Sequence, residues 1–544
     1  MPDFVEPVVP TLTQYKLARK QLAIVMKELG LVPGRYELEE AKSRIDPASQ
    51  RLRGHLETRL AELDRGQLIR ACIEQNDAAL VAERLKIQRA RQSLTHDVEY
   101  SRLEAVEDAR KEFGSASRHY RYLLEKAVAS STTGAAPIND GILRELVALV
   151  DWYMVLTGAS DVLHNEVDVG GVDIDDSYIP DVFYSGTSDE REGDYVREYS
   201  KSRLGIDIKE EDAVEGESDE LLSSAEVRDA FLSDLGFELQ HLLASLAALS
   251  QAQARGLGPE LSLSYSATPE RVVETLVEAV VGLDQAAAVK IVAFLTLSGA
   301  GVLRLPGRDV DEPDVPYWEH KKRVQRYAIR PLVPLRAELS WGAEAASRAM
   351  NIWMSSVRDG YLPADFDWPT VVPLVRKIKQ SIEKRLELRA EEILRRHTKY
   401  VTRGIDFYRR FRSEGFDDVG DFDVLAYWPE TNLMVAVECK YNQPPHTIKD
   451  SRRLRDIIFA ESEESRRGQL SRISGRRDFL AKHRDRMLEL LKWPAAAEKE
   501  PGYLELYVGR DVYYWMLHPP YAVPTEFVRV DALDAWIETK LRDS

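Results

Sequence analysis

The alternation of apolar and polar residues is clearest toward the C-terminal end of the chain. Residues 420–426 (Gly-Asp-Phe-Asp-Val-Leu-Ala) and residues 435–440 (Val-Ala-Val-Glu-Cys-Lys) are short, apolar and alternating, which predicts two β-strands. The segment between them, residues 428–432, has the composition of a turn. The pattern therefore predicts a β-hairpin with its turn centred between Glu430 and Thr431.

The predicted hairpin brings charged residues together. A turn at that position places Asp423 opposite Glu438, and Asp421 opposite Lys440. Because side chains alternate along a strand, Glu438 and Lys440 share one face, and Cys439 points to the other. Like charges directly opposite each other destabilise a sheet, and a divalent cation between the two carboxylates would remove that repulsion.

Helical spacing precedes the hairpin over residues 372–394, where apolar residues recur every three or four positions. Glu383, Glu387 and Glu391 recur at intervals of four within this segment, so they share one face. Of the three, Glu387 is flanked by apolar residues typical of a buried face. An ordinary solvent-exposed role is the alternative for each of the three.

A basic, helix-prone run follows the hairpin over residues 451–493. Gln469 and Arg472 lie one turn apart in it, and Arg476 follows one turn later. Arginine guanidinium groups fit phosphate oxygens, so we expect these three residues to contact nucleic acid. Acidic residues are interleaved in the run, so a solvated helix of mixed charge is the alternative.

Strand patterns resume at residues 503–508, 513–517 and 526–530, and a closing helix is expected at residues 531–537. Helix, hairpin, helix and further strands is the order of elements in an α/β/α domain.

The rest of the chain has mostly helical spacing. Residues 12–130 contain few glycines or prolines, and residues 130–137 have the composition of a linker. Residues 165–220 are very acidic, which predicts a solvated loop or an interaction segment. Thr268 before Pro269 is typical of a helix start.

These patterns predict a multidomain protein whose N-terminal and central regions are mostly α-helical and whose C-terminal domain is α/β/α. A chain of 544 residues is too long for one core. We expect a helical N-terminal region at residues 1–130, an acidic segment plus a helical central domain at residues 138–365, and the α/β/α domain at residues 371–544.

Cysteine content and hydropathy indicate the cellular location of the protein. Cys72 and Cys439 are the two cysteines, which favours a reducing compartment over a disulfide framework. The residues after Met1 do not resemble a signal peptide, and the apolar run at residues 288–295 is too short to span a membrane. We therefore expect a cytoplasmic protein with no membrane partner.

Charge is distributed unevenly along the chain. The net charge is −17, but residues 371–544 contain 32 Lys and Arg against 29 Asp and Glu, a net charge of +3, so the remainder carries −20. An acidic region repels DNA, and it could instead bind a protein partner, drive self-assembly, or simply keep the protein soluble.

Two carboxylates and one ammonium group on a hairpin suit a metal-dependent phosphodiesterase. Mg²⁺ and Mn²⁺ prefer oxygen ligands, and a bound metal can polarise a phosphate and lower the pKa of a water molecule. A nearby lysine can orient that water and offset negative charge in the transition state. The chain has no Gly-x-x-x-x-Gly-Lys-Ser/Thr loop, which argues against a nucleotide-driven motor.

The strand at residues 420–426, the turn and then Glu438-Cys439-Lys440 resemble the core of the PD-(D/E)xK nuclease superfamily, which has the restriction-endonuclease-like fold. The resemblance covers the C-terminal domain only. The Pro-Asp dipeptide of the superfamily's name is absent, and Gly420 and Phe422 occupy that neighbourhood.

On this resemblance, Asp423, Glu438, Lys440 and Glu387 are the catalytic residues, the last because members often carry a glutamate on the helix before the core strands. Asp423 and Glu438 would bind Mg²⁺ or Mn²⁺, with the backbone carbonyl of Cys439 as a further ligand. The implied function is a nuclease, with DNA as the expected substrate and with bacterial restriction or antiphage defence as the setting suggested by the domain layout. The helical region would then be a sensor or assembly module.

Two other functions stay open at this point. The substrate could be RNA or a branched repair intermediate. Alternatively, the nuclease-like domain could be an inactive interaction scaffold, although the presence of Asp423, Glu438 and Lys440 together argues against that.

Overall fold

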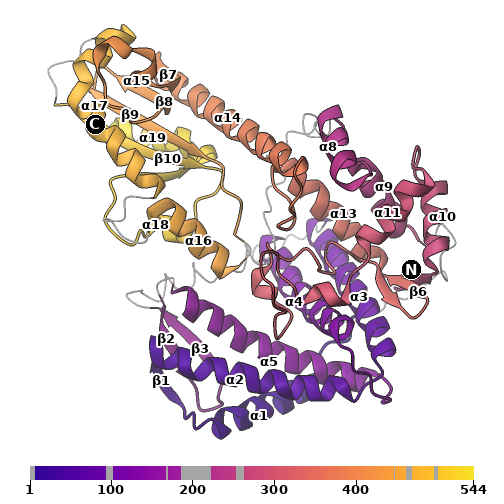
Figure 1. Ribbon diagram of the computed structural model, residues 1–544. Coiled ribbons are helices and arrows are strands. Elements are labelled where there is room, and N and C mark those ends of the chain that lie inside the picture. The colour runs from indigo at the N-terminus through magenta and orange to yellow at the C-terminus, as the bar shows by residue number, and fades with distance from the viewer. Residues whose placement is uncertain are drawn as a thin grey trace. The chain divides into compact units, whose positions relative to one another are not determined.

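The computed structural model describes residues 6–92, 102–166, 169–184, 222–252, 263–445, 447–460, 468–494 and 500–543. The described residues form two compact units, the first ending at Val375 and the second beginning at Arg376 (Figure 1). Most of the acidic segment predicted at residues 165–220 lies outside the described residues.

The first unit is mostly helical, as predicted. Its helices are α1 (Leu12–Glu28), α2 (Leu38–Ala61), α3 (Arg65–Gln92), α4 (Arg102–Ala129), α5 (Asp140–Asn165), α8 (Ala225–Leu235), α9 (Leu239–Ser250), α10 (Pro269–Ala279), α11 (Gln285–Leu295), α12 (Gly299–Val302) and α13 (Ala343–Arg358). The predicted start of α10 is confirmed, because the Thr268 hydroxyl accepts a hydrogen bond from the Arg271 N–H at 3.3 Å.

Two small antiparallel sheets accompany these helices, and the sequence patterns did not predict them. One has the order β1-β2-β3 and the other β4-β6-β5. Their strands are β1 (Gly34–Glu37), β2 (Val169–Ile174), β3 (Pro180–Tyr184), β4 (Tyr265–Ala267), β5 (Val333–Leu335) and β6 (Glu338–Trp341). The strands are three to six residues long, too short for an alternating pattern to stand out.

The segment predicted as a linker, residues 130–137, packs against the junction of α2 and α3. The Gly134 N–H donates to the Leu63 carbonyl at 2.9 Å, and the Asp64 N–H donates to the Ala136 carbonyl at 2.8 Å. The structure has two compact units where the sequence predicted three parts, because residues 1–130 and the central region belong to the same unit.

Helix α5 is a longer apolar segment than residues 288–295, the run considered from the sequence. It is long and apolar enough to cross a membrane, and it is the one such helix among the described residues. However, 67% of its most apolar window is buried inside the first unit, as in the core helix of a globular domain.

The second unit is built on a five-stranded mixed sheet. Its order is β11-β10-β9-β8-β7, with β7–β8 and β8–β9 antiparallel and β9–β10 and β10–β11 parallel. The strands are β7 (Tyr400–Ile405), β8 (Phe422–Trp428), β9 (Leu433–Lys440), β10 (Gly502–Gly509) and β11 (Glu526–Arg529).

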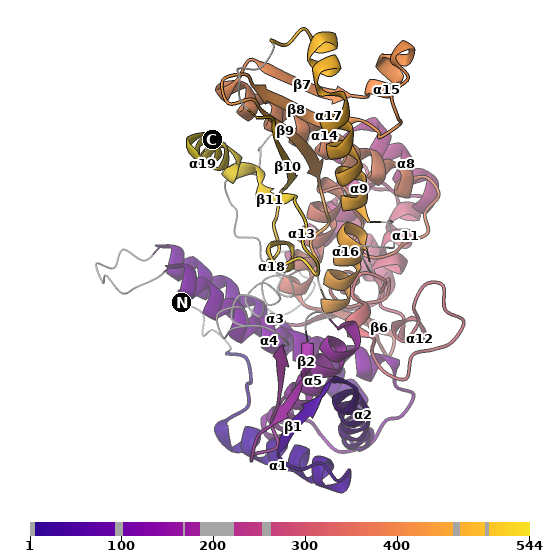
Figure 2. The same cartoon turned by 90° about the vertical axis from the view of Figure 1, so that its left-hand side faces the viewer.

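Helices cover both faces of this sheet. Buried residues of α14 (Val371–His397) and α19 (Leu533–Asp543) share one apolar cluster with one sheet face. Residues of α17 (Gln469–Leu491) share a second cluster with the other face, and α16 (Ile448–Phe459) packs with the start of α17 in a third. Figure 2 shows α16 and α17 on one side of the sheet and α19 on the other.

The predicted order of elements in the C-terminal region therefore forms three layers around a mixed sheet. One prediction was wrong: residues 513–517, expected to be a strand, contain the short helix α18 (Tyr514–Leu517). Tyr513, Trp515 and Met516 pack against the same apolar cluster as α16 and α17, so a run of apolar residues was mistaken for strand alternation.

Candidate active site on the central hairpin

The central hairpin has the register that the sequence predicts. Val424 pairs with Val437, and the pairing continues without a slip to Trp428 opposite Leu433. One position beyond the first of these pairs, Asp423 and Glu438 lie side by side. Asn432 adopts a left-handed conformation in the turn, with φ of 55°, which asparagine tolerates better than most residues.

The hairpin buries both carboxylates. Asp423 is 7% exposed and Glu438 is 8% exposed, because β8 and β9 are interior strands of the sheet and helices cover its faces. Asp423 Oδ2 accepts a hydrogen bond from the Cys439 N–H at 2.8 Å, which ties the start of β8 to the end of β9. Asp421 precedes β8 and is exposed, so the expected partnership with Lys440 belongs instead to Asp423.

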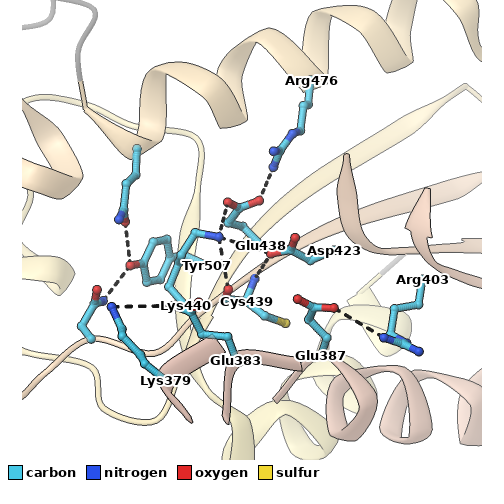
Figure 3. A network of polar contacts seen from close by, with 12 residues as sticks. Lys379, Glu383, Glu387, Arg403, Asp423, Glu438, Cys439, Lys440, Arg476 and Tyr507 are labelled. Carbon is cyan, nitrogen blue, oxygen red and sulfur yellow. Dashed lines mark hydrogen bonds and ion pairs between the residues drawn. The ribbon is translucent and has the colours of Figure 1, made fainter. Parts of the chain in front are cut away.

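Lys440 joins the two carboxylates. Its Nζ lies 2.7 Å from Glu438 Oε1 and 3.5 Å from Asp423 Oδ2, and it donates to the Cys439 carbonyl at 3.3 Å (Figure 3). Burial lowers the pKa of the Lys440 ammonium, but the neighbouring carboxylates outweigh burial and raise that pKa overall. Lys440 is therefore a cation in this site at neutral pH.

The surroundings that favour the charged form of Lys440 favour the neutral form of Asp423. Burial, followed by repulsion from Glu438, raises the pKa of Asp423 to about 7, despite the opposing effects of Lys440 and the Cys439 N–H. Two carboxylates forced together out of water are the arrangement that a bound cation stabilises.

Glu387 reaches the site from α14. It lies 3.6 Å from Arg403 of β7, and burial raises its pKa. Its negative charge contributes to the raised pKa of Asp423, which places it near the carboxylate pair. In Figure 3 the Glu387 carboxylate lies on the side of Asp423 away from Arg476.

The two other glutamates of the same helical face have their own partners. Glu383 lies 3.8 Å from Lys379, one turn earlier on α14. Glu391 lies 2.7 Å from Arg395 and 3.0 Å from Arg403. Glu387 is the member of the three whose charge contributes to the raised pKa of Asp423, and its carboxylate lies beside Asp423 in Figure 3.

The side chain and the backbone carbonyl of Cys439 lie in different surroundings. The thiol belongs to the apolar cluster under α14 and α19, and burial raises its pKa well above the usual value. The backbone carbonyl accepts from Lys440 at the site. Only the main-chain oxygen of Cys439 is therefore placed to contact a cation there.

The three residues expected to bind nucleic acid have different surroundings in the structure. Arg476 is buried, and its guanidinium forms an ion pair with Glu438 Oε2 and donates to the Val419 carbonyl at 3.3 Å. Arg472, one turn earlier on α17, is exposed. Gln469 lies at the start of α17 and accepts a hydrogen bond from the Tyr507 hydroxyl at 2.9 Å.

Tyr507 and Arg403 are site residues that sequence reasoning missed. Tyr507 of β10 pairs directly with Glu438 in the parallel ladder, and its hydroxyl also accepts from the Asn442 side chain at 2.8 Å. The alternation in residues 503–508 predicts which residues of this strand lie on the same face as Tyr507. It does not predict which strand lies alongside, because that pairing joins distant segments.

The donors in this site fit a hard divalent cation. Asp423, Glu438 and the Cys439 carbonyl provide oxygen atoms, and Mg²⁺ or Mn²⁺ completes its ligand set with water and substrate phosphate when proteins supply few ligands. Within the part of the chain that the structure describes, no group of three or more His, Cys, Asp or Glu side chains is gathered around one metal position. The protein's share of such a site would therefore be two carboxylates and one main-chain oxygen.

Comparisons of the chain with protein-family models, with curated proteins and with solved structures found no match.

Proposed function

We propose that the second unit is a metal-dependent nuclease that hydrolyses phosphodiester bonds, with DNA as the expected substrate, and that its sheet is a restriction-endonuclease-like core. The observation that carries the proposal is the position of Lys440 between two buried carboxylates, Asp423 and Glu438, at the middle of a mixed sheet. Burying these charges carries a desolvation cost, and buried carboxylates with a shifted pKa beside a lysine are candidates for a metal or catalytic site.

Asp423, Glu438 and the Cys439 carbonyl would hold Mg²⁺ or Mn²⁺. When bound, such an ion supplies a Lewis acid for the phosphate and lowers the pKa of a water molecule. Lys440 Nζ, kept protonated by its neighbours, can donate to the attacking water or to a phosphate oxygen and stabilises the negative charge that develops during hydrolysis. Arg472, exposed one turn from Arg476 on α17, can bind a neighbouring phosphate.

The first unit would act as a sensor or assembly module. The region outside residues 371–544 has a net charge of −20, which disfavours direct contact with DNA and favours a protein partner or further copies of this chain. A role in bacterial restriction or antiphage defence is an analogy based on domain layout. A cytoplasmic location fits Cys72 and Cys439, which are both free and buried.

Purified full-length protein incubated with supercoiled DNA, linear DNA, single-stranded DNA and RNA tests the proposal. Each substrate is combined with Mg²⁺, Mn²⁺ or EDTA, and the wild type is compared with Asp423→Asn and Glu438→Gln. The control is Glu430→Gln, because Glu430 is an exposed carboxylate at the turn of the same hairpin.

We expect metal-dependent cutting that both site variants abolish and the control retains. The substrate that is cut decides between DNA, RNA and a repair intermediate. If no substrate is cut and calorimetry detects no Mn²⁺ binding, the nuclease proposal is wrong and the unit is an interaction scaffold.

A further inference from the structure

Glu438 has its two oxygen atoms committed to two different cations. Lys440 Nζ contacts Oε1 at 2.7 Å, and the Arg476 guanidinium contacts Oε2. The Glu438 and Arg476 side chains are 9% and 10% exposed. Little water therefore screens this ion pair, and a third cation that approaches Glu438 is repelled by the two cationic side chains already there.

The formal charges around the pair are already balanced. The ion pairs described above join equal numbers of carboxylates and cations: Asp423, Glu438, Glu387 and Glu391 with Lys440, Arg476, Arg403 and Arg395. A divalent cation added to this set leaves two uncompensated positive charges in a buried place. Either a cationic side chain must withdraw or an anion must arrive with the metal.

Arg476 is the cation that can withdraw. Lys440 is tied to two carboxylates and to the Cys439 carbonyl. Arg476, on α17, contacts one carboxylate, Glu438, and is otherwise held by the Val419 carbonyl at 3.3 Å. A phosphodiester offers the Arg476 guanidinium two oxygen acceptors in place of Glu438, in the geometry that arginine prefers. The exposed Arg472 one turn away would hold the next phosphate in the same direction.

We propose that Arg476 couples metal binding to substrate binding: its guanidinium occupies Glu438 in the free protein and transfers to a phosphate of the bound phosphodiester when Glu438 takes up a divalent cation. This inference rests on the proposed nuclease function and specifies how the same site is regulated. It makes the free protein a weak metal binder and the substrate complex a strong one. By thermodynamic linkage, the metal strengthens substrate binding by the same factor.

Mn²⁺ binding to the full-length protein without nucleic acid tests the first half of the inference. Titration calorimetry and the electron paramagnetic resonance signal of free Mn²⁺ report affinity without any need for catalysis. Arg476→Gln should bind Mn²⁺ about tenfold more tightly than the wild type, within the usual range of coupling between sites. Glu438→Gln should abolish this binding, and Arg477→Gln, an exposed arginine on the same helix, should leave it unchanged.

A DNA oligonucleotide with phosphorothioate linkages, shown on gels to stay intact during the measurement, tests the second half. Wild-type affinity for Mn²⁺ should rise about tenfold with the oligonucleotide, and that of Arg476→Gln should rise less, because only direct binding of the metal by the phosphate remains. Arg476→Lys retains a cation with one ammonium in place of the guanidinium fork. It should lie between the two, and it replaces Arg476→Gln if circular dichroism shows that the glutamine variant is unfolded.

The outcomes separate this inference from the nuclease proposal. If the wild type and Glu438→Gln bind Mn²⁺ equally, the metal site itself is wrong and both proposals fall. If Glu438→Gln loses binding but Arg476→Gln binds no more tightly than the wild type, Arg476 is a fixed support for Glu438 and only the coupling is overturned. Equal tightening by the oligonucleotide in wild type and Arg476→Gln also overturns it.

Discussion

Tyr507 and Gln469 are 38 residues apart in the chain, and the Tyr507 hydroxyl donates a 2.9 Å hydrogen bond to the Gln469 side chain. The same hydroxyl accepts from Asn442, which follows β9. Gln469 opens the helix that carries Arg476, and Tyr507 lies next to Glu438 in the sheet. One phenol therefore connects the strand bearing Glu438 with the helix bearing its arginine partner.

Replacing Tyr507 with phenylalanine should impair cutting while the fold survives. The variant keeps the ring in its apolar cluster but leaves the Asn442 and Gln469 side chains without this partner, a loss of about 1–3 kcal/mol in the free energy of unfolding. Because the start of α17 is then less fixed, we expect a several-fold lower cutting rate with Mn²⁺ affinity nearly unchanged. Steady-state assays and calorimetry on one preparation measure both quantities.

Tyr503→Phe is the matched control for that prediction. Tyr503 lies on the same strand and face as Tyr507 and is half-buried against the apolar cluster that includes α17. Its cutting rate should stay within twofold of the wild type. Equal rates for Tyr507→Phe and Tyr503→Phe would show that the hydrogen bonds to Asn442 and Gln469 do not position the site.

Glu387 should matter more for cutting than Glu391. Glu387→Gln removes a negative charge that acts directly on Asp423, so we expect at least a tenfold loss of cutting. Glu391→Gln removes pairs with Arg395 and Arg403 at the border of the site, and we expect less than a threefold loss. Initial rates at saturating Mg²⁺ decide, and an equal loss in both variants would assign Glu387 a purely structural role.

The central hairpin could be predicted from the sequence because its determinants are local. The apolar alternation and the turn lie within about twenty residues, and the side-chain period of two then fixes which of Asp423, Glu438, Cys439 and Lys440 share a face. The helix at residues 372–394 was recognisable for a similar reason, since α14 keeps one apolar face over its whole length.

The rest of the candidate site depends on contacts between distant segments. The parallel pairing of Tyr507 with Glu438 joins strands on either side of two helices, and no local pattern specifies it. Arg476 looked like a phosphate ligand because a basic helix gives no sign of which arginine turns inward. Its ion pair with Glu438 becomes visible only when α17 packs on the sheet.

Two glycines of the first unit should respond to alanine with opposite signs. A Cβ at Gly134 would lie 2.0 Å from the Glu62 carbonyl oxygen, so Gly134→Ala must separate residues 130–137 from the end of α2 and should cost about 1–3 kcal/mol. A Cβ at Gly54, inside α2, meets nothing within 4 Å, so Gly54→Ala should add about 0.5–1 kcal/mol.

Thermal unfolding of the full-length protein followed by circular dichroism at 222 nm measures both variants against the wild type. A lower melting temperature for Gly134→Ala and a higher one for Gly54→Ala is the expected result. If Gly134→Ala melts with the wild type, residues 130–137 do not pack against the α2–α3 junction, and the linker predicted from composition is restored.

The stability of the first unit should fall as pH rises, because of Asp77. This buried carboxyl of α3 accepts hydrogen bonds from the Glu344 N–H at 2.7 Å and the Ala345 N–H at 3.0 Å at the start of α13. Burial nevertheless raises its pKa from 3.8 to about 8. Between these two values the folded protein holds a proton that the unfolded chain has released.

The sign of the effect follows from that difference in bound protons. The contribution of Asp77 is present in full below about pH 4, declines by up to about 1.4 kcal/mol per pH unit, and is lost once pH exceeds about 8. Asp77→Asn carries no proton to release, so its melting temperature should decline less steeply than that of the wild type from pH 5 to pH 8. Parallel declines would mean that the Asp77 carboxyl is ionised in the folded protein, with the two backbone N–H groups outweighing burial.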